Sequence, residues 1–274
     1  MRDELSLSRG PAAFRIMNTT APFDFSRHFD RVLVISLSRA TDRQDAVSRQ
    51  LAPGSFEWIW AVDKRTLESS DPSFNGRVDS EACKRHHPVG KSIQPGEVAV
   101  SLSHRLAYER MLENNWKTVL ILEDDFVVDT KQIGLLARMQ EELPVDWDVW
   151  YLGYDKRTQV PAGWPIKKYF YLLLHGLKIR TRYSRNTLHH FYPQPWSAHL
   201  NKAGFHDCLH AYAVNRKAAA RLLHDQQPIK YVADHLVAHR VTSGDLQGFV
   251  SIPRLIYQPE QLSEDKIFSY RKND

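Results

Sequence analysis

The segment Lys-Thr-Val-Leu-Ile-Leu-Glu-Asp-Asp-Phe-Val-Val-Asp, residues 117–129, joins a short apolar run to a cluster of acids. Residues 118–122 are mostly apolar with a β-branched start, which predicts a buried strand. Glu123, Asp124 and Asp125 follow at once. Ligands of open α/β sheets bind at the carboxyl ends of the strands, so these acids predict a binding site. Carboxylate oxygens suit Mg²⁺ or Mn²⁺ and, through the cation, a phosphate-bearing substrate. Alternatively, the acids only cap a turn or begin a helix.

Upstream segments alternate between strand and helix patterns. Residues 31–37 (RVLVISL) form an apolar, β-branched run, and residues 56–62 (FEWIWAV) form a second one. Between them, residues 41–51 have a helical pattern, with Thr41 as the expected N-cap. This alternation predicts an α/β fold with a parallel sheet.

Downstream segments extend the same alternation. The expected helices are residues 98–113, 131–143 and 216–224, and Asn215 is expected to cap the last of them. The expected strands are residues 147–152 and 211–214, and a last apolar segment lies at 252–258. Residues 71–95 are rich in Pro, Gly, Ser and Asn and are expected to form a loop. Residues 154–207 show little alternation of strand and helix.

Candidate binding side chains also occur outside the acid cluster. Arg39 and Arg43 lie where the first strand passes into the first helix, a place suited to phosphates or a nucleotide. The alternative for both is a solvent-exposed surface arginine. Asp234, His235 and His239 lie close together further on, and on a helix the two histidines would share a face.

The composition is that of a folded enzyme, with 274 residues, 42% hydrophobic and 25% charged. This length supports one large α/β domain or two small ones. Two isolated cysteines predict neither a zinc motif nor a disulfide framework, so a reducing cytosol is expected. The sequence shows no transmembrane run and no secretory signal. Residues 1–27 are expected to be a flexible leader, 28–263 the folded domain and 264–274 a polar tail.

The formal net charge of +5 is concentrated in one segment. A basic balance admits nucleic acid, an anionic membrane surface or an acidic small molecule as partner. Eight basic residues and no acid lie between Lys156 and Arg185. Within this segment, residues 167–180 have an apolar centre with basic flanks and are too short to span a bilayer. They either lie in a membrane interface or pack on the core as a hairpin or helix, and both interpretations stay open.

Seven segments occur in the order and spacing of a known family. They are RVLVISLSRATDRQDAVSRQL, AVDKRTL, GEVAVSLSH, LILEDD, WDVWYLG, HAYAVNRKAAARLL with the Asp-His-Leu that follows it, and PRLIYQPEQLS. Together they resemble glycosyltransferase family 25, which includes bacterial lipooligosaccharide galactosyltransferases and collagen galactosyltransferases. The resemblance covers about residues 31–154 and 208–263. The chain departs from the family pattern at Lys64, where glycine is usual, and at Ala99-Val100, which replaces Gly-Cys.

This resemblance implies a GT-A fold of α/β class, a Rossmann-like nucleotide-binding half joined to an acceptor half. It implies inverting, metal-dependent transfer of a hexose, most often galactose, from a UDP-sugar to a lipopolysaccharide, lipooligosaccharide or related glycan, with Mn²⁺ or Mg²⁺ as cofactor. The implied metal ligands are Glu123, Asp125 and His235. The implied general base is Asp234, with a role as metal ligand or sugar-hydroxyl binder left open. The residues implied to border the donor are Leu37, Arg39, Arg43, Asp63, Ser103, His104 and Asp124.

Two other functions stay open at this stage. The departures at Lys64, Ala99 and Val100 allow a catalytically inactive relative that binds a sugar nucleotide. The basic cluster at 156–185, with its tyrosines, allows a nucleic-acid-binding protein, which leaves the acid cluster unexplained. The expected partners are therefore a UDP-sugar, a glycan or glycolipid acceptor and an anionic membrane surface at 156–185, with no nucleic acid. Residues 155–207 are expected to be an insert, and the expected location is the cytoplasm, with peripheral attachment to the inner face of the membrane.

Overall fold

The computed structural model describes residues 21–67, 76–87, 90–177, 179 and 183–258. The strands are β1 (Arg31–Ser36), β2 (Glu57–Trp60), β3 (Thr118–Glu123), β4 (Val127–Val128), β5 (Val149–Gly153), β6 (Gln194–Pro195), β7 (Leu200–Lys202), β8 (Ala211–Asn215), β9 (Gly248–Ser251) and β10 (Ile256–Tyr257). The helices are α1 (Thr41–Gln50), α3 (Ser80–His86), α4 (Pro95–Glu113), α5 (Leu136–Glu142), α6 (Trp164–Gly176), α7 (Arg185–His189), α8 (Arg216–Asp225) and α9 (Ala233–Ser243), with 3₁₀ turns η1 (Phe25–Arg27), η2 (Lys64–Thr66) and η3 (Ile133–Leu135).

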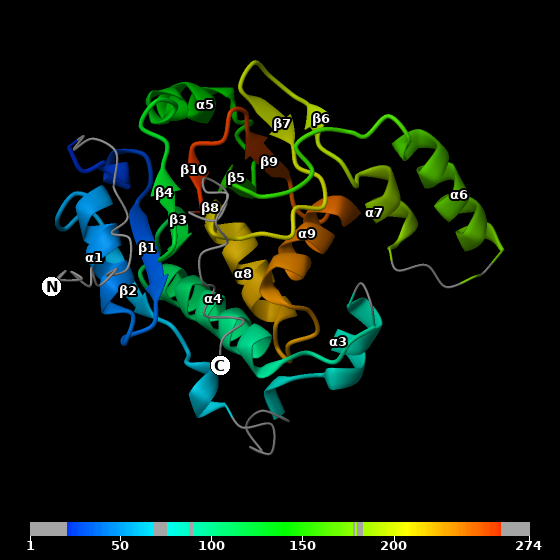
Figure 1. Cartoon of the computed structure of the whole chain (residues 1–274), viewed down its shortest axis with the longest axis horizontal. Helices are drawn as coiled ribbons and strands as arrows, with labels where there is room; N and C mark the ends of the chain where they lie inside the picture. The colour runs from blue at the N-terminus through cyan, green and yellow to red at the C-terminus, as the bar shows by residue number, and fades with distance from the viewer. Residues whose placement is uncertain (1–20, 68–75, 88–89, 178, 180–182, 259–274) are drawn as a thin grey trace, which may run out of the picture.

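Eight of these strands form one sheet in the order β2-β1-β3-β8-β5-β9-β7-β6, and β10 pairs with β4 in a small second sheet (Figure 1). Successive side chains of the central strands point to opposite faces. Leu33 and Ile35 of β1 pack with residues of α4, α8 and α9. Val32 and Val34 pack with residues of α1 and α5. Helices therefore cover both faces, which explains why the central strands are continuous apolar runs rather than alternating ones.

The order of strands reverses at β1. From β1 the chain passes through α1 to β2, and it then returns through α4 to β3, which pairs with the other edge of β1. Both pairings are parallel, so the carboxyl ends of the three strands lie on one edge of the sheet. In open α/β sheets a ligand crevice forms at this reversal. The topology thus predicts a ligand site among the residues that follow β1 and β3.

The prediction of a parallel sheet is only partly correct. The pairs β1–β2, β1–β3 and β5–β9 are parallel, whereas β8 runs antiparallel to both β3 and β5. The sheet is therefore mixed and Rossmann-like. A short apolar run such as residues 211–214 gives no information on strand direction, because the same side chains pack equally well in either sense.

Of the two predicted helix caps, one is confirmed. Asn215 accepts a hydrogen bond from the backbone N–H of Ala218 at 2.8 Å and so caps α8. Thr41 is not a cap, because it is the first residue of α1 and Ala40 occupies the N-cap position. The spacing of apolar residues predicts that a helix is present more reliably than it predicts the residue at which the helix begins.

Three expected irregular segments contain structure. Within 71–95, Asp79 caps the short helix α3 by accepting the N–H of Ala82 at 2.9 Å. Within 154–207 lie α6, α7, β6 and β7. At the N-terminus, residues 21–27 belong to the fold, since Phe25 is fully buried. The leader boundary at residue 27 is therefore too late, while residues 1–20 and the predicted tail at 264–274 lie outside the described part of the chain. None of the helices found among the described residues has the length and apolarity needed to cross a bilayer.

Candidate active site

The three acids of the opening segment lie at the reversal of the strand order. Glu123 is the last residue of β3, and its backbone N–H donates to the carbonyl of His210 at 2.9 Å. Asp124 and Asp125 form the turn that follows. The side chain of Asp124 is 10% exposed and that of Asp125 is 27% exposed. Asp124 thus points into the protein, and Asp125 is the more accessible acid.

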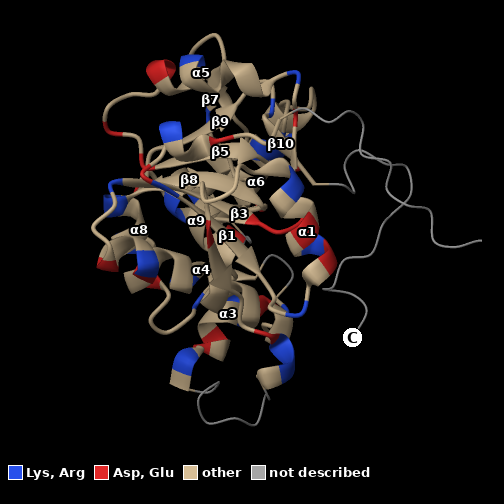
Figure 2. Cartoon of the chain, turned by 90° about the vertical axis from the view of Figure 1, so that its left-hand side faces the viewer, with Lys and Arg blue, Asp and Glu red and all other residues tan. Residues whose placement is uncertain are grey.

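Asp124 is held by the end of β1 and the first turns of α1. Ser36 Oγ donates to one carboxylate oxygen at 2.6 Å, and Arg43 Nη1 donates to the other at 2.8 Å. The same Arg43 nitrogen lies 3.4 Å from Asp125. Figure 2 shows the acidic stretch after β3 beside α1. Burial raises the pKa of the Asp124 carboxyl, and the bonds from Ser36 and Arg43 act in the opposite direction. Arg43 is therefore the cation that offsets the charge of this acidic turn.

Asp125 also contacts the end of the described chain. Gln258 Nε2 donates to Asp125 Oδ1 at 3.1 Å. Gln258 follows β10, which pairs with β4 two residues after the acids. The C-terminal strand pair therefore closes one side of the acidic turn.

Glu123 connects to a chain of buried hydroxyl and imidazole groups. His104 Nε2 lies 3.4 Å from the Glu123 carboxylate, and His104 Nδ1 lies 2.9 Å from the hydroxyl of Tyr212. Since a carboxylate only accepts, Nε2 carries the proton, and Nδ1 of a neutral ring accepts from Tyr212. The Tyr212 hydroxyl in turn lies 2.8 Å from that of Tyr108. This buried chain fixes the orientation of Glu123 from the core side.

The loops after β1 and β2 meet beside the acids. Arg39 Nε donates to Asp63 at 2.8 Å, and this bond lowers the pKa of the Asp63 carboxyl. Asp63 also caps η2 by accepting the N–H of Arg65 at 3.0 Å. Leu37, between Ser36 and Arg39, presents a carbonyl that accepts from the Gln44 amide at 2.9 Å. The structure thus gathers most of the expected donor-site residues on one edge of the sheet.

Ser103 has a structural setting within this group. Its hydroxyl donates to the carbonyl of Ala99 at 2.7 Å and accepts the backbone N–H of Val62 at 2.9 Å. The side chain is buried and ties α4 to the end of β2. The Ser103 hydroxyl uses both its donor and its acceptor capacity in these two hydrogen bonds, so its role is to hold α4 against the end of β2.

Asp234 lies at the start of α9. It is the second residue of that helix, and its carboxylate accepts the backbone N–H of His235 at 2.8 Å. Burial raises the pKa of the Cys208 thiol, and the carboxylates of Glu123 and Asp234 raise it further. Glu123 and Asp234 therefore both act on the Cys208 thiol through their charge.

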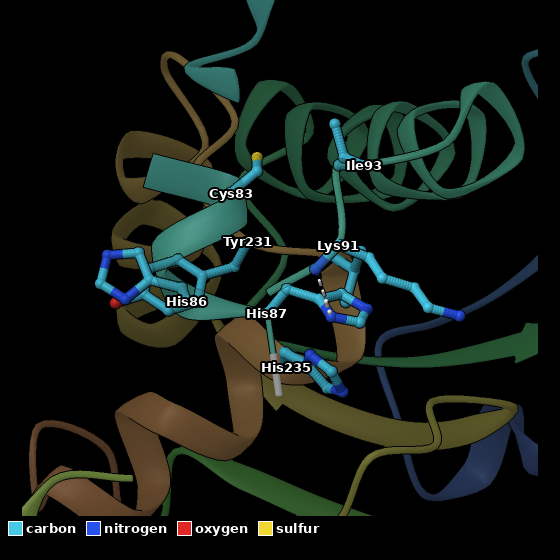
Figure 3. A pocket seen from close by; sticks show the side chains of 8 residues that line it. Cys83, His86, His87, Lys91, Ile93, Tyr231 and His235 are labelled. Carbon is cyan, nitrogen blue, oxygen red and sulfur yellow. Dashed lines mark hydrogen bonds between the residues drawn. The ribbon is translucent and has the colours of Figure 1, made fainter. Parts of the chain in front are cut away.

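His235 does not join Glu123 and Asp125. Its ring lies 6.2 Å from the ring of His87 and 5.8 Å from that of Phe205, centroid to centroid. It lines a cavity of about 10 Å³ between α3 and α9 (Figure 3), together with Cys83, His86, His87, Lys91, Ile93, Tyr231 and Val232. Within the described ranges, no three His, Cys, Asp or Glu side chains are grouped so that they could hold a metal ion. The described residues therefore do not bring Glu123, Asp125 and His235 together as one group of metal ligands.

Sequence reasoning did not single out two further histidines near the site. His210 is fully buried, with Nδ1 2.9 Å from Cys208 Sγ, and its Nε2 has no hydrogen-bond partner among the described residues. Burial lowers the pKa of His210, while Glu123 and Asp125 act to raise it. His206 lies between the rings of Tyr151 and Tyr154. His206 has no periodic or motif signal in the chain, whereas His210 is the first residue of the family segment HAYAVNRKAAARLL and Ser36 is the polar residue that ends a buried strand.

A second hollow lies away from the acids. Five aromatic rings line a groove of about 380 Å³ formed by α6, α7 and the turn after α7. They are Trp164, Tyr171, Tyr183, Phe191 and Tyr192, accompanied by Lys167, Leu188, Pro161 and Gly163. The groove is built from the part of the chain that the sequence leaves without assigned elements.

Comparison with known proteins identifies the family. Residues 29–237 match the family model described as glycosyltransferase family 25 (LPS biosynthesis protein). The chain belongs to glycosyltransferase family 25. The match includes the carboxyl ends of β1, β2 and β3 as well as residues 155–207, so the segment expected to be an insert lies within the matched range. Membership confirms the family expected from the motifs, and the mixed Rossmann-like sheet is consistent with a GT-A type fold.

Curated members of family 25 are similar over part of this chain. One is the probable inactive glycosyltransferase 25 family member 3 of Bos taurus, 33% identical over 130 residues, which are 46% of this chain and 22% of that protein. Another is procollagen galactosyltransferase 2 of Mus musculus, 27% identical over 138 residues, which are 48% of this chain and 22% of that protein. The matched part of the chain spans about a fifth of the length of these relatives.

Among solved structures, the crystal structure of mannose-1-phosphate geranyltransferase from Thermus thermophilus is similar with a TM-score of 0.34 and 11% identity, over 80% of this chain and 58% of that one.

Proposed function

We propose that this chain transfers a hexose, galactose above all, from a UDP-sugar to a hydroxyl group of a glycan or glycolipid, with inversion at the anomeric carbon. One observation carries the proposal. In a member of glycosyltransferase family 25, the turn Glu123–Asp125 meets Arg43 at the crevice between the carboxyl ends of β1 and β3. A relative named procollagen galactosyltransferase supports galactose as the sugar.

The donor chemistry of the acidic turn fits a divalent cation. Glu123 and Asp125 offer carboxylate oxygens, and both side chains are partly exposed. Mg²⁺ and similar hard cations use one or two carboxylates and complete their shell with phosphate oxygens and water. The chain therefore fits a cation shared with a diphosphate, and His235 is not needed as a ligand. When bound, such a cation would neutralise charge on the departing UDP.

Two arginines suit the diphosphate of the donor. Arg43 lies in the first turns of α1, where no side chain caps the helix N-terminus within the described region. Helix N-termini and guanidinium groups both favour phosphate. Arg39 lies in the loop before α1 and reaches Asp63 on the neighbouring loop. We place the diphosphate along this edge, with Leu37 and Asp63 on the nucleotide side.

Inversion requires one general base on the acceptor hydroxyl. Asp234 is the candidate, because it is a partly exposed carboxylate at the start of α9 in the part of the chain that matches the family model, and its charge and that of Glu123 both act on the Cys208 thiol. The N–H of His235 fixes the orientation of the carboxylate at the start of α9. An attacking hydroxyl would give its proton to Asp234 as the bond from the sugar to UDP breaks.

The acceptor is proposed to be a lipopolysaccharide, lipooligosaccharide or related glycan. The family description names LPS biosynthesis, and the procollagen enzyme among the relatives carries the name of a different acceptor.

The test is release of UDP from a panel of UDP-sugars, with and without Mn²⁺, in the absence of acceptor. We expect metal-dependent release from one sugar. Asp125→Asn should lower this release at least about a hundredfold, since it removes a charged group from the centre of the reaction. Glu113→Gln, an exposed acid at the end of α4, is the matched control and should retain wild-type release. Release that is unchanged in Asp125→Asn would defeat the proposal.

A second candidate function has one observation in its favour. A relative that matches 46% of this chain bears a name that calls it probably inactive. In that case the chain would bind a UDP-sugar, seen as a rise in thermal unfolding temperature, without releasing UDP from any member of the panel. Binding and turnover measured on the same preparation separate the two functions.

A further inference from the structure

Helix α6 stands at the edge of the molecule, away from the central sheet (Figure 1). It has 13 residues, and none of them is buried. A helix of this composition, WPIKKYFYLLLHG, would ordinarily place its apolar side against a core. The two sides of α6 therefore need separate explanations.

The inner side of α6 has a partner within the chain. Trp164 and Tyr171 line the aromatic groove that α6 forms with α7, and Lys167, which borders the groove, is exposed to solvent. The ring of Trp164 stacks on that of Phe191 at 5.0 Å between centroids. The imidazole of His175 hydrogen-bonds the carbonyl of Tyr183. These contacts attach α6 to the body and fix which side faces outward.

The outer side is an apolar stripe, defined here as Ile166, Tyr169, Phe170, Leu173 and Leu177. Counted from Ile166, the spacing is three, four, seven and eleven residues, the pattern of one helical face. Each of the five residues is between 57% and 79% exposed. Large apolar side chains this exposed and this contiguous usually mark a surface that another body covers.

The charge around the stripe is of one sign. Between Lys156 and Arg185 the sequence has eight basic residues and no acid. Lys156, Lys167 and Arg185 are exposed. Lys168 Nζ lies 5.8 Å from the centre of the Tyr169 ring, at the border of the stripe. An apolar helical face on a helix that carries lysines and no acid is complementary to an anionic bilayer, where acyl chains meet negatively charged headgroups.

We propose that α6 lies in the interface of an anionic membrane, with the stripe in the acyl region and Lys167 and Lys168 among the headgroups. At 13 residues the helix is too short to span a bilayer, so the attachment is peripheral. Long lysine side chains can follow the apolar surface and keep their ammonium groups in the headgroup layer. This inference does not depend on the proposed sugar transfer.

Vesicle flotation with the full chain tests the inference. The vesicles contain phosphatidylcholine alone or phosphatidylcholine mixed with phosphatidylglycerol. We expect the chain to float with the mixed vesicles, to float less with phosphatidylcholine alone, and to be partly released by salt. Replacing two stripe residues together, Phe170→Ser and Leu173→Ser, should lower the vesicle-bound fraction at least about tenfold. Phe170→Leu, which keeps the side chain apolar, should retain binding.

Two further variants complete the design. Val145→Ser changes a fully exposed apolar residue in the loop between α5 and β5, and it should bind vesicles like the wild type. Lys167→Glu with Lys168→Glu should remove the preference for anionic lipid. Since all replaced side chains are largely exposed or at the surface, thermal unfolding temperatures should be unchanged. UDP release by the stripe variant separates loss of membrane binding from loss of activity.

Four results would overturn the inference. The wild-type chain fails to float with anionic vesicles at low salt, or the stripe variant floats as well as the wild type. Size-exclusion chromatography without vesicles shows a dimer that the stripe variant converts to monomer, which makes a second copy the occupant. A single-stranded oligonucleotide binds through the stripe in place of lipid, which makes the surface a nucleic-acid site.

Discussion

At the scale of single residues, Arg43 offsets the negative charge of two carboxylates in the site. Its Nη1 lies 2.8 Å from Asp124 and 3.4 Å from Asp125, and its side chain is only 21% exposed. Two neighbouring carboxylates without this cation would repel one another in a partly buried turn. The sequence suggested Arg43 as a phosphate contact, and the structure adds that it pairs with Asp124 and Asp125.

We therefore expect Arg43→Met to lower the free energy of unfolding by about 1–3 kcal/mol at pH 7, the usual range for a lost charged hydrogen bond. Loss of the cation raises the pKa of Asp124 further above its unfolded value. A raised carboxyl pKa means that the folded state binds the proton more tightly, so the loss should shrink as the pH falls toward 4. Urea unfolding at pH 7 and pH 4.5 measures both quantities.

Arg49→Met, at an exposed position in the last turn of the same helix, is the control. Arg49→Met should change the free energy of unfolding by less than about 0.5 kcal/mol at either pH. An equal effect of both replacements, or an Arg43→Met effect that grows on acidification, would contradict the proposed pairing.

At the scale of elements, Asn215 joins three parts of the fold. Its side-chain oxygen caps α8, and its amide donates to the carbonyl of Trp147 and to the carboxylate of Asp148. Asp148 is buried just before β5 and also accepts the backbone N–H of Gln247 at 2.9 Å. The cap was predictable from sequence, but the contacts to Asp148 depend on strand pairing that no local pattern reports.

Asn215→Ala should lower the free energy of unfolding by about 2 kcal/mol, because it removes a cap and leaves a buried carboxylate with fewer donors. Equilibrium urea unfolding gives the value. Asn186→Ala, on the exposed side of α7, makes the same chemical change without these contacts and should cost less than about 0.5 kcal/mol. Equal losses of unfolding free energy in the two variants would show that the side-chain contacts of Asn215 do not stabilise the fold.

Some of the predicted strands and helices are confirmed by the structure, and others were missed. The strands at 31–37 and 118–122 are confirmed as β1 and β3 within a residue at either end, since long apolar runs with β-branched residues have few alternatives. Both open interpretations of 167–180 allowed a helix, and α6 is that helix: Trp164 packs against a buried aromatic cluster, whereas no residue of α6 is itself fully buried. The short helix α3 was missed, because its seven residues offer less than two turns of periodicity to read.

At the scale of the whole molecule, the buried His206 and the half-buried His239 contribute to the response to acid. Burial lowers the pKa of His206 to about 4, with Arg157 adding to the effect. Burial also lowers the pKa of His239 to about 4, with His235 and His86 adding to it. In the unfolded chain both would titrate near 6.5. Between those values the unfolded state binds more protons, so stability is lost as the pH falls from about 6.5 toward 4.

We expect the free energy of unfolding to decrease on acidification from pH 7 to pH 5, by up to about 1.4 kcal/mol per pH unit for each proton taken up. Denaturant unfolding at half-unit intervals measures the slope. His239→Gln should reduce the slope, whereas His189→Gln, at an exposed position, should not. A flat profile in the wild type across this window would show that His206 and His239 are already protonated or easily solvated in the folded state.

The amino-acid sequence by itself determined the α/β class, the first strands and helices, the acidic turn and the family. These features follow from side-chain periodicity and from ordered motifs, which are local properties of the chain. Only the tertiary structure decided the antiparallel direction of β8, the pairing of Arg43 with Asp124, the separation of His235 from the acids and the outward stripe of α6. Each of these depends on which segments meet in space, and contacts between residues far apart in the chain leave no trace in local periodicity.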